Sequence, residues 1–123
     1  MNILCITHAD FETPGVIETW VHQKKHNLTI VSPYKGDNLL NHKNFDLLIL
    51  MGGPQSPLEF EKDPYLRNEI FLIKQAMKDD KFILGFCLGA QLLGEALGGK
   101  TMRSPEKEVG VFPITLTSEG LKD

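Results

Sequence analysis

The sequence has few residues of the kinds that define several protein classes. Among its 123 residues there are two cysteines, Cys5 and Cys87, too few for the disulfide framework of a small secreted domain. Sixteen acidic and 13 basic residues give a net charge of -3, without a basic stripe that could follow a nucleic-acid backbone. No apolar run approaches the roughly 18 residues of a membrane span, and the N-terminus lacks the basic and apolar regions of a signal peptide. We therefore expect a cytoplasmic protein that binds neither nucleic acid nor membrane.

Patterns that hold metals and cofactors are also missing. The two cysteines and four histidines show no paired ligand spacing, and neither a P-loop nor a G-x-G-x-x-G fingerprint occurs. We expect no metal and no cofactor. The four histidines all precede Cys87, so no imidazole follows the second cysteine.

Short apolar runs alternate with helical patterns along the chain. Strands are predicted at residues 3–6, 28–31, 45–51 and 82–85, with a further one at 111–117. Four strands interleaved with helices predict an α/β fold. We expect one domain over residues 1–123, a doubly wound, flavodoxin-like, mostly parallel sheet with helices on both faces.

Three helices are predicted between these strands. The first begins with Thr13 as N-cap and Pro14 at the first helical position, and the second is capped by Asp63-Pro64. The third follows residue 87 and stops at Gly98-Gly99. The apolar positions expected to face the core are Val16, Ile17, Trp20 and Val21 in the first helix, Leu66, Ile70, Ile73 and Met77 in the second, and Leu88, Leu92, Leu93, Ala96 and Leu97 in the third.

The most informative segment is Gly85-Phe86-Cys87-Leu88-Gly89-Ala90-Gln91, which follows an apolar run. Glycines two residues before and two after Cys87 leave room for a strained strand-to-helix turn of the kind that carries nucleophiles. Amides at the N-terminus of the following helix favour thiolate over thiol. A packed, unreactive cysteine at a tight turn is the alternative interpretation. We predict that Cys87 is a nucleophile.

Two other features follow predicted strands and should meet Cys87 at the carboxyl edge of the sheet. They are His8, after the first strand, and Gly52-Gly53-Pro54, after the third. The glycine pair lets the backbone offer an amide which, with the Leu88 amide, forms an oxyanion hole beside Cys87. For His8 two interpretations stay open: it hydrogen-bonds within its own loop, or it lines a substrate rim with Glu12.

Three motifs together resemble class I glutamine amidotransferases, especially stand-alone proteins similar to the amidotransferase domain of GMP synthase. They are Met51-Gly52-Gly53-Pro54-Gln55-Ser56-Pro57, the Cys87 segment, and Glu108-Val109-Gly110, in the order and spacing of that family. The resemblance covers residues 1 to about 123. It implies that Cys87 attacks the side-chain amide of glutamine or a γ-glutamyl compound, releasing ammonia and leaving a glutamyl thioester that water cleaves.

By the same resemblance the oxyanion amides belong to Gly53 and Leu88, and substrate is bound by Gln91, Val109 and Gly110, with His8 as a further candidate. Members of the family complete their site with a downstream His-x-Glu pair, which these 123 residues do not contain. We therefore expect an N-terminal, apparently truncated portion of the domain with an incomplete site. We also expect a homo-oligomer that covers apolar surface around Leu92 and Phe112.

Two alternatives to an amidotransferase remain. One is a catalytically inactive binding or remnant domain. The other is a cysteine hydrolase on an α/β-hydrolase scaffold, because G-x-C-x-G also fits that turn. The glycine-rich turn at Met51 and the glutamine at position 91 favour the amidotransferase.

Overall fold

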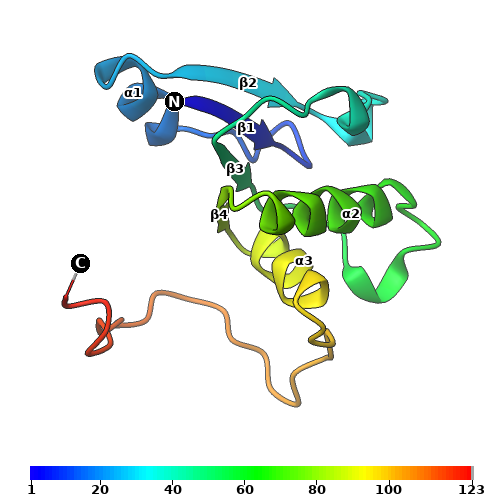
Figure 1. The fold of residues 1–123 in the computed structure, drawn as a ribbon. Coiled ribbons are helices and arrows are strands. Elements are labelled where there is room, and N and C mark those ends of the chain that lie inside the picture. The colour runs from blue at the N-terminus through cyan, green and yellow to red at the C-terminus, as the bar shows by residue number, and fades with distance from the viewer. Residues whose placement is uncertain (123) are drawn as a thin grey trace.

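Four of the predicted apolar runs form one parallel sheet in the computed structural model, which describes residues 1–122 (Figure 1). The strands are β1 (Asn2–Ile6), β2 (Asn27–Val31), β3 (Leu47–Leu50) and β4 (Phe82–Gly85), in the order β2-β1-β3-β4. Every neighbouring pair is parallel, with Leu4 opposite both Thr29 and Leu48. Parallel strands end at a common edge, so the loops after β1, β3 and β4 meet there.

Alternate residues of the strands face two different helical layers. Leu4, Ile6, Leu48 and Leu50 pack with the helices α2 (Tyr65–Lys78) and α3 (Leu88–Ala96). Ile3, Cys5 and Ile49 face the other way, toward Val21 of α1 (Val16–Gln23). In Figure 1, α2 and α3 lie together on one side of the sheet. The predicted doubly wound sheet with helices on both faces is confirmed.

Three short 3-10 turns complete the ordered elements. They are η1 (Pro33–Lys35), η2 (Leu39–Asn41) and η3 (Pro57–Glu59). The longest helix, α2, has 14 residues, and among residues 1–122 no helix has the length and apolar character needed to cross a membrane.

The first helix begins later than predicted. Thr13 and Pro14 lie in the loop, and Gly15 is the N-cap of α1 without any side-chain cap bond. Gly15 has a φ of 54°, which is outside the right-handed helical region and open to glycine at low cost. The helix can therefore start only after this residue.

Several residues predicted to face the core are exposed. Val16 and Leu97 are 84% and 66% exposed, and Trp20 and Met77 lie at the margin of the core. Val16 and Trp20 line an open groove between α1 and the strands β3 and β4, so no described element covers them. Met77 and Leu97 lie at the C-terminal ends of α2 and α3. Of the two residues around which apolar surface was expected, Leu92 is fully buried, whereas Phe112 is 53% exposed.

The strand predicted at residues 111–117 is absent from the structure. The chain after Gly99 leaves the helices as an irregular segment, visible in orange and red in Figure 1. Its alternating apolar side chains are exposed, Ile114 to 95%. A strand needs a neighbour that accepts and donates its backbone hydrogen bonds, and this segment pairs with no strand of the described sheet. Apolar alternation alone was therefore not sufficient to form a strand at residues 111–117.

Candidate active site

Cys87 occupies a strained turn between β4 and α3. Its φ of 50° and ψ of -109° place an L-residue in the left-handed half of backbone space, which costs about 1–3 kcal/mol. Cys87 is the N-cap residue of α3, and its carbonyl accepts the Gln91 amide at 3.1 Å. The thiol residue is exposed, whereas Cys5 is buried in β1. This is the predicted strand-to-helix elbow.

The two flanking glycines make the turn sterically possible. A Cβ on Gly85 would lie 2.7 Å from the carbonyl carbon and oxygen of Gly89. A Cβ on Gly89 would collide with the Leu50 carbonyl oxygen of β3. The predicted need for glycine on both sides of Cys87 is confirmed, because α3 packs directly on the backbone of the sheet.

The glycine pair after β3 runs between Cys87 and the end of β1. A Cβ on Gly52 would stand 3.4 Å from the Cys87 Cβ and 2.8 Å from a carboxylate oxygen of Glu12. A Cβ on Gly53 would stand 2.5 Å from the Cβ of His8. The three loops predicted to converge on this edge do converge there, and Glu12 joins them.

Two backbone donors are available beside the thiol. Leu88 is the first residue of α3, so its N–H has no partner within the helix. The Gly53 N–H donates to no protein acceptor within residues 1–122. Unpaired amides next to a nucleophile are what an oxyanion hole requires. Their assignment to that role stays a prediction.

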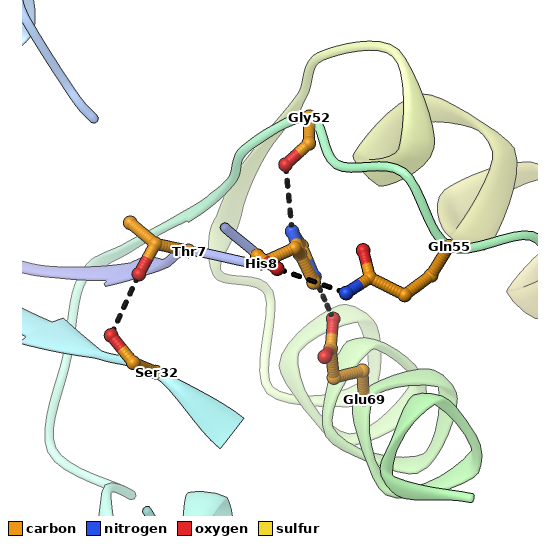
Figure 2. A network of polar contacts seen from close by, with 6 residues as sticks. All are labelled: Thr7, His8, Ser32, Gly52, Gln55 and Glu69. Carbon is orange, nitrogen blue, oxygen red and sulfur yellow. Dashed lines mark hydrogen bonds and ion pairs between the residues drawn. The ribbon is translucent and has the colours of Figure 1, made fainter. Parts of the chain in front are cut away.

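His8 lies inside the protein, behind the glycine pair. It is 1% exposed, with Nδ1 3.2 Å from the carbonyl oxygen of Gly52 and Nε2 2.9 Å from Oε2 of Glu69 (Figure 2). Gln55 donates to the His8 carbonyl oxygen at 2.9 Å. Neither of the two interpretations left open holds as stated, because the His8 side chain does hydrogen-bond, but to the turn after β3 and to α2 and not within its own loop. The side chain does not line a rim, and with both nitrogens occupied it is no base for Cys87.

Glu69 is the buried partner of His8 that sequence analysis missed. It lies 61 positions from His8, on the buried face of α2 with Leu66 and Ile73, and is 0% exposed. Burial raises the pKa of the Glu69 carboxyl, and the hydrogen bond and charge of His8 oppose that rise. The sequence signal that could have revealed Glu69 is its position as a single acidic residue within the apolar stripe of α2.

A small polar cluster surrounds this pair. Gln55 Oε1, the Tyr65 hydroxyl and Glu69 Oε1 are buried and have no hydrogen-bond partner among the described residues. Burial raises the pKa of Tyr65, and the carboxylates of Asp63 and Glu69 add to the effect. Unpaired buried polar atoms are rare, and a bound water is the usual partner.

The predicted substrate residues are spread over two parts of the structure. Gln91 is exposed one turn after Cys87 on α3. Val109 and Gly110 lie in the irregular segment after α3, where Val109 is 86% exposed and a Cβ on Gly110 would meet only Phe112 within 4 Å. The structure places Gln91 beside the elbow and does not bring Val109 or Gly110 into contact with it. Their binding roles remain predictions. Among the described residues no three side chains are grouped to hold a metal ion.

The fold and this edge of the sheet define a class of protein: a flavodoxin-like α/β domain with a cysteine at a strand-to-helix elbow, facing a glycine turn. Comparison with known proteins gives the same result. The family model for glutamine amidotransferase class I matches residues 14–121. The chain belongs to the class I glutamine amidotransferase family.

Individual relatives agree with this assignment. Over 126 aligned residues the chain is 40% identical to the putative glutamine amidotransferase-like protein YfeJ of Salmonella typhimurium, covering 99% of this chain and 53% of that protein. It is 39% identical over 89 residues to a GMP synthase (glutamine-hydrolyzing) of Alkaliphilus metalliredigens, covering 71% of this chain and 16% of the synthase. The crystal structure of SMU.1228c superposes with a TM-score of 0.89 at 42% identity, over 100% of this chain and 54% of that one. The chain thus spans about half the length of YfeJ and SMU.1228c.

Proposed function

We propose that this domain uses Cys87 to attack the side-chain amide of glutamine or of a γ-glutamyl compound. The thiolate adds to the carbonyl carbon and the oxygen becomes an oxyanion. The nitrogen then takes up a proton from solvent and leaves as the C–N bond breaks, as ammonia from glutamine or as an amine from a substituted γ-glutamyl amide. Water then cleaves the glutamyl thioester to release glutamate and restore the thiol. The observation that supports this proposal is the exposed Cys87 at a strained elbow, directly against the Gly52-Gly53 turn.

The oxyanion is held in this proposal by the N–H groups of Gly53 and Leu88. Each such donor contributes about 3 kcal/mol in acyl transfer. Gln91 contacts substrate from the first turn of α3. Both cysteines are free thiols, which supports a reducing, cytoplasmic setting.

The test uses an activated substrate, the γ-p-nitrophenyl ester of glutamate. Its nitrophenolate leaves without help from a general acid, so acylation does not depend on a histidine after Cys87. We expect a glutamyl adduct on Cys87 by mass spectrometry of the intact protein and its peptides. Cys87→Ala is the control for the site of the adduct. The α-p-nitrophenyl ester of glutamate is the control for recognition of the γ-glutamyl group.

A binding domain without chemistry is the competing function, because His8, the histidine at this edge of the sheet, has both ring nitrogens hydrogen-bonded to groups other than Cys87. It predicts no adduct, while glutamine still shifts backbone amide NMR signals around Gly52 and Gln91.

A further inference from the structure

The pair of His8 and Glu69 is fully buried, which costs both side chains their contact with water. Both side chains are 0% exposed, and they lie in the loop after β1 and on α2, 61 positions apart in the sequence. Replacing a buried ion pair by apolar residues of similar size is often neutral or stabilising. The pair therefore invites a functional explanation, and its third partner, the Gly52 carbonyl, lies in the active-site turn.

The hydrogen-bond pattern determines which nitrogen of His8 carries a proton. A carbonyl oxygen can only accept, so Nδ1 must donate to Gly52. One further proton lies between Nε2 and Glu69 Oε2. Whether it resides on the imidazole or on the carboxyl, Nδ1 keeps its own hydrogen. Glu69 thus holds His8 as a donor toward Gly52, as a carboxylate does for a metal-binding histidine.

That single hydrogen bond orients a peptide plane. The Gly52–Gly53 peptide bond is trans, so the Gly52 carbonyl and the Gly53 N–H point in opposite directions from one plane. With the carbonyl drawn toward His8, the Gly53 N–H points away from the imidazole. Two consecutive glycines have little conformational preference of their own, so this peptide could otherwise flip.

We propose that His8 is a positioning residue, held by Glu69, whose Nδ1–H fixes the Gly52–Gly53 peptide with the Gly53 N–H toward the oxyanion formed at Cys87. The inference deepens the proposed function and rests on it. It also agrees with the buried location of His8, whose ring lies between Gly52 and Glu69 (Figure 2) and is out of reach of substrate.

Two substitutions at His8 separate the roles of its two ring nitrogens. His8→Asn puts an amide N–H near the position of Nδ1 and keeps a donor for Gly52. His8→Gln puts one near the position of Nε2 and keeps only the contact with Glu69. Acylation by the γ-p-nitrophenyl ester forms a C–S bond, expels nitrophenolate and passes through an oxyanion. Alkylation by iodoacetamide displaces iodide from carbon and forms no oxyanion.

We expect His8→Gln to slow acylation of Cys87 by about 100-fold, the effect of losing one oxyanion donor, while alkylation changes less than about threefold. His8→Asn should stay within about tenfold of wild type in acylation. Equal acylation by His8→Gln and wild type, or parallel loss of both reactions, would overturn the positioning role. If wild-type Cys87 forms no glutamyl adduct, the proposed function fails instead.

A measurement on the wild-type protein tests the inference even if the His8 variants do not fold. The ¹⁵N NMR spectrum of His8 should show a protonated Nδ1 at neutral pH. An Nδ1 without hydrogen could not donate to Gly52 and would refute the inference directly.

Discussion

Replacing Gly89 by alanine tests how α3 and its elbow are held on the sheet. A Cβ at this position would collide with the Leu50 carbonyl oxygen and stand 2.5 Å from the Leu50 Cβ. Ordinary carbon contacts are about 3.5–4.0 Å, so α3 would have to move outward by about 1 Å. The obstacle is largely backbone of a central strand, which cannot rotate away.

Gly94 is the matched control because it lies in the same helix with nothing within 4 Å of its would-be Cβ. Gly94→Ala should stabilise the protein by about 0.5–1 kcal/mol through helix propensity. Gly89→Ala gains the same propensity but also overpacks a rigid contact, which costs about 1–3 kcal/mol. Because the contact is with backbone, we expect a net loss near 2 kcal/mol.

Urea unfolding followed by far-UV circular dichroism measures both changes. With a slope of about 1–2 kcal/mol per molar urea, Gly89→Ala should lower the midpoint by about 1 M or more, and Gly94→Ala should raise it. If the Gly89→Ala midpoint equals or exceeds that of Gly94→Ala, the close packing of α3 on β3 is not what requires glycine at this position.

Four further outcomes are expected. Brief iodoacetamide treatment should label Cys87 and spare Cys5, because burial raises the pKa of the Cys5 thiol to about 12; equal labelling in peptide mass spectra would contradict the elbow. Glutamine hydrolysis by this 123-residue chain should fall short of a complete triad enzyme by about 10⁴-fold or more, since no histidine follows Cys87; ready ammonia release would refute this. Because the pKa of Glu69 is raised in the folded protein, its bound proton contributes to the free energy of unfolding. That contribution is complete below a pH of 4.5, the ordinary carboxyl pKa, and is lost as the pH rises. Glu69→Gln, which cannot lose that proton, should therefore gain stability relative to wild type in melts above about pH 4.5, and a constant difference would argue against a shared proton. Light scattering at micromolar concentration should show a homo-oligomer, because an apolar groove of about 270 Å³ beside Trp20 and Leu84 is open; a thermally stable monomer would contradict this.

Much of the fold could be predicted from local patterns. The runs that became β1 and β3 are short and mostly apolar, as is typical of strands buried on both faces of a parallel sheet, whereas the edge strands β2 and β4 are partly exposed. Their alternation with helices fixes the class of fold. It also places the loops after β1, β3 and β4 at one edge, so the meeting of His8, Gly52 and Cys87 followed from topology.

Element ends and surface positions were less predictable. The start of α1 depended on the positive φ of Gly15. The Thr13-Pro14 pair, which is typical of a helix start, led to the wrong first residue. The apolar alternation at residues 111–117 was real, but strand formation depends on a partner edge that local sequence does not contain.

The sequence by itself determined the parallel α/β fold, the elbow at Cys87 and the family, because these depend on neighbours within a few residues and on the order of short motifs. Only the tertiary structure decided what His8 does. Its partners, Gly52 and Glu69, lie 44 and 61 positions away, and the packing of α2 against the sheet edge brings them together. A buried polar contact of that kind depends on how distant elements pack, and no local pattern around His8 records it.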